Sequence, residues 1–339
     1  MCISLRKEFI MKYVLSEDNP LFVKQVNKYS FPFNGGYPDG ITGWLKRLEP
    51  FKPFIHDIFL SCPNANDFFS SNIVKMNSND YLERCAQLLQ ILKDTHEYKA
   101  VITLNGNYTN LSLKDKYVLA GKVAEQVHKY DIYGCVISNF DIALKLHELC
   151  PNLVLNTSCN IPQYTTSALD AYKSFIQIIN PSRNSSRNIP LLKDMAAHGF
   201  KIKLLLNEPC DLTCPNICTY CPKSQDISYP CYGWRTKSSP LHSCIILPRW
   251  LNIFDEFIDH YKLTGRYNIH VDYILNQFVY YLHRTDNCYL HEFHPNCKIP
   301  ILVKDIPDEL LYCNQVDCDK CQICQKVFDQ QQFKATIMF

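Results

Sequence analysis

The sequence lacks several features that would assign it to a common class of protein. Its 35 lysines and arginines nearly balance 33 aspartates and glutamates, so the net charge of +2 does not indicate a nucleic-acid-binding protein. No apolar run approaches the roughly 18 residues that a membrane-spanning helix needs. The N-terminal residues carry charges inside any apolar stretch and no small-residue cleavage site, unlike a signal peptide. We therefore expect a cytoplasmic protein with no membrane partner.

The sequence also lacks the usual motifs of hydrolases. It contains neither His-Glu-x-x-His, the motif of zinc proteases, nor Gly-x-Ser-x-Gly, the motif of serine hydrolases. His242 beside Cys244 is a candidate Cys–His pair, but a cysteine that binds a metal cluster is not available as a nucleophile. Proteolysis is therefore the less favoured function.

Cysteine, by contrast, is abundant, with 18 in 339 residues. One cluster follows an apolar, strand-like segment at 201–207 and comprises Cys210, Cys214, Cys218 and Cys221. A second cluster lies near the C-terminus and comprises Cys313, Cys318, Cys321 and Cys324. Tight cysteine clusters in a chain without a secretion signal are typical of metal binding in a reducing compartment.

The spacing of the C-terminal cluster, Cys-x4-Cys-x2-Cys-x2-Cys, favours iron–sulfur over zinc. Zinc ribbons and fingers separate two ligand pairs by a dozen or more residues, whereas four thiolates this close together are typical of [4Fe-4S] binding. The spacing is not that of ferredoxins and lacks their closing proline. Zinc and reduced structural thiols stay open as alternatives.

The periodicity predicts an α/β fold, a (β/α)8 TIM-type barrel with a small cysteine-rich extension. Apolar strand-like runs alternate with helical patterns, as in a closed parallel barrel, with an open doubly wound sheet as the alternative. The expected strands are 57–62, 99–105, 132–139, 152–157, 175–180, 201–207, 243–247 and 260–265. The expected parts are a lead-in at 1–54, the barrel at 55–266, and a helix with the cysteine-rich tail at 267–339.

Polar residues recur where these strands end. Asparagines stand at five such ends, namely Asn105, Asn139, Asn156, Asn180 and Asn207. Together they predict a polar pocket at the carboxyl-end mouth, where barrel enzymes place their sites, although asparagine also simply terminates strands. Nearby, Arg183 and Arg187 suit a carboxylate or phosphate, and Glu208 suits a proton donor. Solvated surface positions are the alternative for all three.

The middle cysteine cluster has two interpretations. Cys214, Cys218 and Cys221 form Cys-x3-Cys-x2-Cys, which resembles the radical S-adenosylmethionine motif. Alternatively, Cys210 or Cys244 supplies a fourth ligand and closes the cluster. Position favours the second interpretation, because five predicted strands precede the motif and only two follow it, whereas radical enzymes place the motif after their first strand.

The position of the motifs along the chain also suggests a resemblance to a known family. The segment CIILPRWLNIFDEFIDHYKLTGR, which ends in Lys262, Gly265 and Arg266, resembles the closing βα unit of the peptidase U32 family. The NEPC…CP step after the 201–207 segment is similar to the cysteine-bearing loop of that family. The resemblance covers roughly residues 55–270, and the tail resembles a cysteine-rich extension of some short members. Thr264 stands where the family has an acidic residue.

The resemblance implies an iron–sulfur enzyme with a four-cysteine cluster. Matching by position suggests the ligands Cys210, Cys214, Cys221 and Cys244, with Cys218 and Cys231 as competitors. Family members include iron–sulfur enzymes that hydroxylate RNA bases or a quinone precursor without dioxygen, and others described as collagenase-like proteases. We therefore expect one [4Fe-4S] cluster in the barrel and a second in the tail.

The expected function is oxygen-independent hydroxylation, or a related redox modification, of an RNA base, an aromatic metabolite or a peptide, with an electron donor or partner subunit. The expected catalytic residues are Glu208, Asn105, Asn156 and Arg266. The expected substrate-binding residues are Asn139, Asn180, Arg183, Arg187 and Lys262. The alternatives are a radical enzyme that uses S-adenosylmethionine, a U32-type peptidase, and a non-catalytic iron–sulfur partner subunit.

Overall fold

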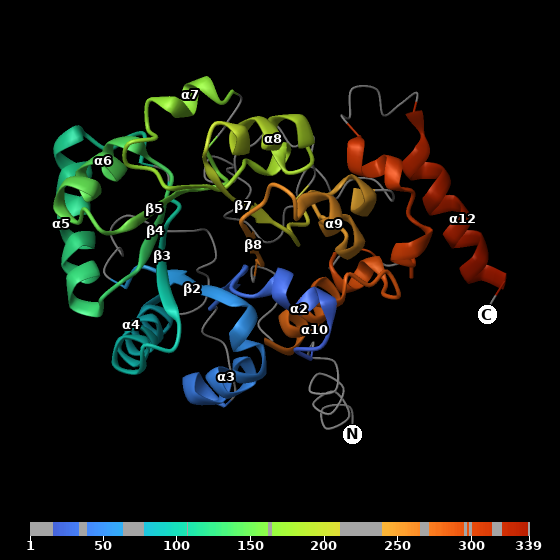
Figure 1. Cartoon of the computed structure of the whole chain (residues 1–339), viewed down its shortest axis with the longest axis horizontal. Coiled ribbons are helices and arrows are strands. Elements are labelled where there is room, and N and C mark those ends of the chain that lie inside the picture. Colours follow the sequence, from blue (N-terminus) through green and yellow to red (C-terminus); the bar gives the residue numbers. More distant parts are fainter. Residues whose placement is uncertain are drawn as a thin grey trace.

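Eight parallel strands form a closed barrel, which confirms the predicted (β/α)8 fold (Figure 1). The computed structural model describes residues 16–33, 39–63, 78–106, 108–161, 165–210, 239–264, 271–294, 297, 300–313 and 321–337. The strands are β1 Tyr29–Pro32, β2 Ile55–Ser61, β3 Lys99–Leu104, β4 Gly134–Ile137, β5 Val154–Thr157, β6 Ile178–Ile179, β7 Lys201–Leu205 and β8 His260–Lys262. Neighbours in the chain are neighbours in the sheet, and β8 pairs with β1 to close it.

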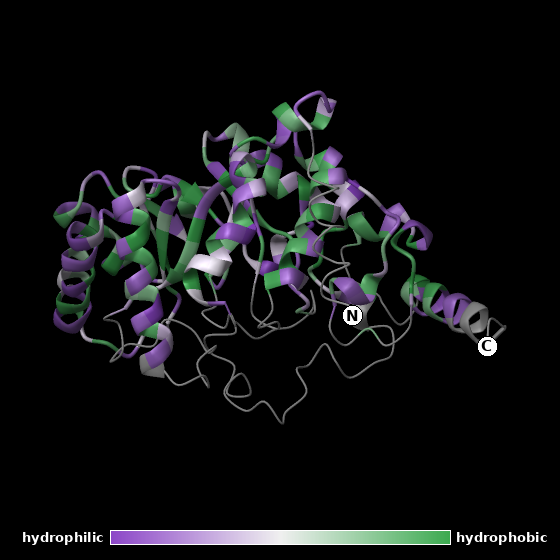
Figure 2. Cartoon of the chain, turned by 90° about the horizontal axis from the view of Figure 1, so that it is seen from below, coloured by the Kyte–Doolittle hydropathy of each residue, from purple (hydrophilic) through white to green (hydrophobic). Residues whose placement is uncertain are grey.

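Helices surround the barrel and continue into the C-terminal part of the chain (Figure 1). They are α2 Pro20–Gln25, α3 Gly40–Leu48, α4 Ser78–Thr95, α5 Leu113–Tyr130, α6 Phe140–Leu149, α7 Ser167–Asp170, α8 Ile189–Ala197, α9 Leu251–Phe254, α10 Val271–His283 and α12 Ile323–Ile337. Figure 2 shows the strands largely hydrophobic, while the outer helices alternate between hydrophilic and hydrophobic residues. The main core accordingly lies between the strands and the helices.

The barrel begins at β1, inside the segment that the sequence assigned to a lead-in. Tyr29 and Phe31 alternate with Ser30, and this period of two places aromatic rings on one face and a hydroxyl on the other. The rings face outward: the Tyr29 ring centroid lies 4.8 Å from that of Phe278 in α10. The strand is short and is followed by a turn-rich sequence, and its signal is therefore easily read as part of a loop.

The prediction of a barrel strand at 243–247 is wrong, since these residues form no strand. The segment instead runs beside the end of β7. Ile246 donates its backbone N–H to the carbonyl of Leu206 at 2.8 Å, and Cys244 donates to the carbonyl of Cys210 at 2.7 Å. Its residues are apolar because they are buried at this position, and burial alone does not distinguish a barrel strand from an extended loop segment.

A buried ion pair crosses the barrel interior between β2 and β7. Lys203 donates to Asp57 Oδ2 at 2.6 Å, and both side chains are almost fully enclosed. Ser30 donates to the same oxygen at 2.8 Å, and His56 Nδ1 lies 2.6 Å from it. Burial acts to raise the pKa of Asp57, but Lys203 and His56 outweigh it and hold the pKa well below its ordinary value. The carboxylate therefore stays charged inside the barrel.

Two histidines lie together at the same level. The rings of His56 and His260 have centroids 4.0 Å apart. Burial, with smaller contributions from His56 and Lys203, lowers the pKa of His260 to about 3. His260 is therefore neutral at physiological pH. This network lies toward the amino ends of the strands, the end of such barrels that serves stability.

Replacing Asp57 by Asn should lower the free energy of unfolding by about 3–5 kcal/mol, because Lys203 would be left buried without its carboxylate. Chemical denaturation of the two proteins measures this difference. Glu148→Gln is the matched control, since it breaks the exposed pair of Lys145 and Glu148 at 2.8 Å and should cost less than about 1 kcal/mol. Equal effects of the two substitutions would contradict the role assigned to Asp57.

His260 should make stability depend on pH. The unfolded imidazole binds a proton below about pH 6.5, whereas the folded one does so only below about pH 3. Between these values the unfolded state holds more protons, so stability falls as the pH is lowered. His260→Gln should flatten the decline in unfolding free energy between about pH 6 and pH 4. The same replacement at exposed His291 should leave that decline unchanged, and an unaltered slope in His260→Gln would disprove the assignment.

Candidate functional site

Three of the predicted asparagines are buried in the carboxyl-end half of the barrel. They are Asn105 after β3, Asn156 in β5 and Asn180 after β6. The carboxamide oxygen of each finds no hydrogen-bond partner among the described residues. Buried polar atoms normally have partners, so these oxygens mark positions where a substrate or water would bind. Asn180 is oriented by its amide nitrogen, which donates to the carbonyl of Thr157 at 2.5 Å.

The other two asparagines have structural partners. Asn139 is the N-cap of α6, and its side-chain oxygen accepts from the backbone N–H of Ile142 at 3.2 Å. Asn207 bridges β7 to β8: its side chain accepts from Thr264 N–H at 2.6 Å and donates to the Thr264 carbonyl at 3.1 Å. It also donates to Gln277 of α10 at 2.5 Å. The amide of Asn207 thus continues the pairing where the strands themselves have ended.

Cys210 and Cys244 lie together at the carboxyl ends of the strands. Both are buried, a backbone hydrogen bond of 2.7 Å joins them, and they form a small cluster separate from the main core. Arg183, from the loop after β6, donates from Nη1 to Cys210 Sγ at 3.1 Å. A guanidinium in contact with a sulfur favours the thiolate, which is the form that binds metals.

Arg187, four residues further along, connects this pair to the C-terminal tail. Its Nη2 donates to the carbonyl of Ile245 at 2.6 Å and its Nη1 to the carbonyl of Leu310 at 3.2 Å. The guanidinium also lies 5.1 Å from the ring centroid of Trp250. Burial lowers the pKa of Arg187 to about 10, while the thiols of three cysteines act in the opposite direction. These are Cys244, Cys313 and Cys324.

The tail therefore lies against the barrel mouth. Arg249 fixes it by donating to the carbonyl of Val303 at 2.6 Å and to Asp308 Oδ1 at 2.9 Å. The indole N–H of Trp250 donates to the same Asp308 oxygen at 2.7 Å. Of the tail cysteines, Cys313 and Cys324 are half-buried and Cys321 is exposed.

Two further charged residues that the sequence singled out lie near the carboxyl ends of the strands. Lys262 of β8 lies over the ring of Phe59, 4.0 Å from its centroid, and is buried. Glu208 is fully buried between the end of β7 and Cys210. It lies near His294, a buried residue that the sequence gave no reason to select, since a single histidine in an irregular segment carries no pattern. Burial lowers the pKa of His294 to about 4, against the effect of its hydrogen bond to the backbone of Pro209 and the charge of Glu208.

Several predicted ligands fall outside the described residues. They are Cys214, Cys218, Cys221, Cys231 and Cys318, together with Arg266. Within the described residues, no three histidine, cysteine or acidic side chains are grouped closely enough to hold a metal ion. The twelve described cysteines form no disulfides.

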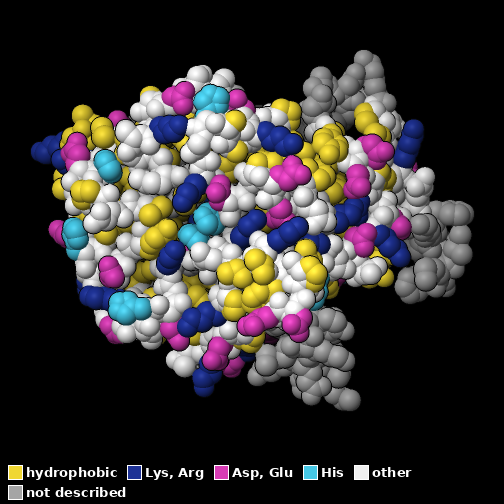
Figure 3. All heavy atoms as spheres, in the orientation of Figure 1, with side chains coloured by type: hydrophobic (Ala, Val, Ile, Leu, Met, Phe, Trp, Pro, Cys, Tyr) yellow, Lys and Arg dark blue, Asp and Glu magenta, His cyan; other side chains and the backbone are white. Residues whose placement is uncertain are grey.

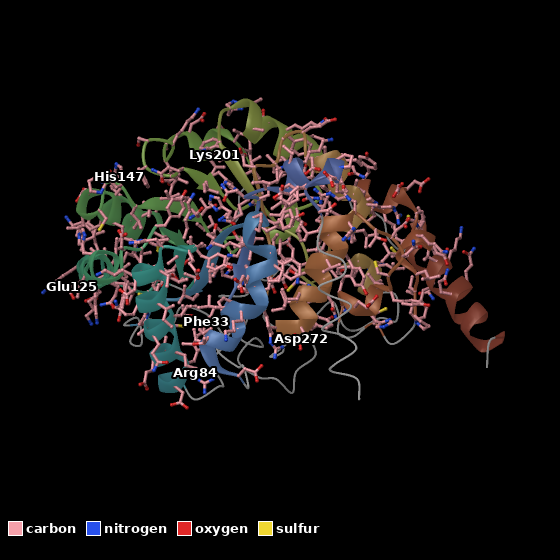
Figure 4. All side chains as sticks on the ribbon, turned by 60° about the horizontal axis from the view of Figure 1, so that its bottom comes forward. Phe33, Arg84, Glu125, His147, Lys201 and Asp272 are labelled. Atoms are coloured by element: carbon pink, nitrogen blue, oxygen red, sulfur yellow. The ribbon has the colours of Figure 1, made fainter. Side chains whose placement is uncertain are left out.

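A pocket of about 680 Å³ opens at the opposite end of the barrel from Cys210 and Cys244. It is lined by residues that precede or begin β2, β3 and β4, including His56, Lys99 and Tyr133. In Figure 4, Lys201 at the amino end of β7 and Phe33 just past β1 mark the two ends of the barrel. The carboxyl end is the candidate site, because Cys210, Cys244, the two arginines and the unpartnered amide oxygens lie there.

The charged side chains on the surface show no concentration of one sign on the face in view (Figure 3). Figure 3 shows acidic and basic side chains interspersed over the visible face, without a continuous field of one sign.

None of the helices in the described ranges has the length and apolar character that crossing a bilayer requires. No protein-family model matches the chain, and no curated protein matches it either.

The cap role of Asn139 is testable. Asn139→Ala should lower the free energy of unfolding by about 1 kcal/mol, because the N–H of Ile142 would lose its acceptor at the start of α6. Asn139→Ser should retain most of the stability, since serine is also a good N-cap. Denaturant titrations of both variants provide the measurement. If alanine and serine destabilise the protein equally, the side chain acts through something other than the cap.

Proposed function

We propose that the protein is an iron–sulfur enzyme, similar to the peptidase U32 family, which carries out an oxygen-independent hydroxylation or a related redox modification. The observation that carries this proposal is the environment of Arg187. Its guanidinium is buried, and no carboxylate contacts it among the described residues. A buried charge requires a counter-charge. Among the described residues, the thiols of Cys244, Cys313 and Cys324 act on Arg187 in the direction of such a counter-charge.

The residues present fit an iron–sulfur centre. Cys210 and Cys244 are adjacent and buried, and Arg183 donates to Cys210 Sγ. Hydrogen bonds and positive charge at the coordinating sulfurs are among the features that set the potential of such centres. The remaining barrel ligands would come from Cys214, Cys218, Cys221 and Cys231, in the stretch 211–238. A bound cluster supplies one-electron chemistry at the mouth of the barrel.

The neighbouring residues suit a polar substrate. The unpartnered oxygens of Asn105, Asn156 and Asn180 accept hydrogen bonds, so they favour a group rich in N–H or O–H donors. An RNA base, a hydroxylated aromatic metabolite and a peptide all carry such donors. Lys262 adds a positive charge for an anionic part of the substrate. Glu208, close to His294, is the candidate for moving a proton.

The proposed reaction needs an oxygen source other than dioxygen. With water as the source, the conversion of R–H to R–OH releases two electrons and two protons, and the electrons require an acceptor. With an organic oxygen donor, the donor itself is reduced. Either route places a redox centre next to a substrate pocket and requires exchange of electrons or substrates with a partner.

Anaerobic purification followed by iron and sulfide analysis tests the proposal. The wild-type chain should contain iron and acid-labile sulfide, and Cys244→Ser should lose about half of both if each centre is a [4Fe-4S] cluster. Cys150→Ser is the matched control, because Cys150 is a buried cysteine that lines the pocket at the other end of the barrel. It should retain the full iron content. Zinc in place of iron, or equal losses in both variants, would refute the proposal.

A turnover assay separates an enzyme from a non-catalytic subunit. RNA or small molecules that co-purify anaerobically with the loaded protein are the first substrates to test, and mass spectrometry should detect a gain of one oxygen atom. Asn180→Asp should weaken substrate binding, because the new carboxylate brings a charge into the buried polar pocket. Its iron content should stay at the wild-type level, since the hydrogen bonds of Asn180 in the described structure go to Thr157.

A further inference from the structure

We propose that the pocket at the amino end of the barrel is a second binding site, which takes a small aromatic molecule whose hydroxyl group donates a hydrogen bond to His56 Nε2. Every residue that lines this pocket belongs to the described part of the chain. Its volume of about 680 Å³ lies within the range of small-molecule sites. The proposal does not rest on the proposed function, because the two sites share no residue.

Asp57 fixes the orientation of the His56 ring and the position of its proton. The side chain of His56 is only 5% exposed, and its Nδ1 lies 2.6 Å from Asp57 Oδ2. Lys203 and Ser30 donate to the same oxygen at 2.6 and 2.8 Å. An oxygen that accepts from three donors is a carboxylate oxygen without a proton of its own. Nδ1 of His56 therefore carries the hydrogen, and Nε2 of the neutral ring is left as an acceptor.

This acceptor faces the pocket. Asp57 and Lys203 compensate each other's charge without a ligand, but His56 Nε2 makes no hydrogen bond in the described structure. His56 lines the pocket, and its Nε2 is not sealed from solvent as Nδ1 of the neighbouring His260 is. The His260 ring, with its centroid 4.0 Å from that of His56, supports the ring from one side. An oriented and mostly buried acceptor that opens into a pocket favours a ligand with a hydrogen-bond donor.

The rest of the pocket suits an aromatic body that carries a hydroxyl. The half-buried ring of Tyr133 lies edge-on to the His56 ring, with centroids 5.8 Å apart, and offers a surface on which another ring packs well. The buried apolar walls include Leu92, Ile132 and Leu153. Lys99 lies at the exposed rim, with its Nζ 4.6 Å from the Tyr133 ring centroid, and adds a donor. A hydroxyl both donates and accepts hydrogen bonds, so it suits His56 and Lys99 better than an N–H group does.

The test is a calorimetric titration of the full-length protein with two probes, 2-naphthol and its methyl ether, 2-methoxynaphthalene. The probes share an aromatic body, but only 2-naphthol has a donor. The wild-type protein should bind 2-naphthol about tenfold more tightly, as expected for one hydrogen bond to a mostly buried acceptor. His56→Phe should bind the two probes equally, because it keeps a ring and lacks the acceptor. His291→Phe is the matched control at an exposed position outside the pocket, and it should keep the tenfold preference.

A measurement on the wild-type protein keeps the inference testable if His56→Phe does not fold. In protein labelled with ¹⁵N-histidine, 2-naphthol should shift the Nε2 resonance of His56, which is assigned through the contact of its ring with Tyr133, and 2-methoxynaphthalene should not. Binding of neither probe, equal binding of both to the wild type, an unshifted Nε2 resonance, or a preference that survives in His56→Phe would each overturn the inference. None of these outcomes bears on the iron–sulfur proposal, which the iron and sulfide analysis tests separately.

Discussion

A buried positive charge with no carboxylate partner among the described residues is the constraint on which the carboxyl-end site depends. Arg187 has carbonyls, an aromatic ring and thiols around it in the described structure, and carbonyl dipoles only partly replace the water that the charge has lost. Burial lowers the pKa of Arg187, and the thiols of three cysteines from two distant stretches of the chain act in the opposite direction. A centre with a net negative charge at this position would satisfy the arginine and hold the tail against the barrel.

At the other end of the barrel, a buried positive charge is compensated in a different way. There the buried cation Lys203 has a carboxylate, Asp57, which is also bonded by Ser30 and lies beside His56. Every strong charge of that network is compensated within the protein, so it needs no ligand and serves the closure of the sheet. At the carboxyl end, amide oxygens and a guanidinium nitrogen lack partners among the described residues. Asp57 Oδ1 and His260 Nδ1 of the first network also lack partners among the described residues, so the two ends differ in whether the buried cation has a carboxylate partner there.

The asparagines at the strand ends show how much of the candidate site can be predicted from the sequence. Asn105, Asn156 and Asn180 are buried at the predicted positions with open acceptors, whereas Asn139 and Asn207 serve as a helix cap and a strand bridge. All five follow or end apolar runs, so the sequence pattern is the same for both groups. What differs is the partner, and the partners of Asn207 lie 57 and 70 residues away in the chain. His294 was missed for a similar reason, because its neighbour Glu208 is remote in sequence.

By itself the sequence determined the alternation of apolar strands with helices, and hence a parallel barrel. A strand that is buried on both faces is a nearly continuous apolar run, and such a run can be recognised from neighbouring residues alone. It also contains the two groups of closely spaced cysteines, and its polar strand ends led us to expect a site at the carboxyl ends. Only the tertiary structure decided that Tyr29–Pro32, and not the segment 243–247, completes the barrel, since both are short, buried and extended. It alone decided that Arg187 hydrogen-bonds the carbonyls of Ile245 and Leu310. Contacts between distant residues arise from closure of the sheet, and no local pattern encodes them.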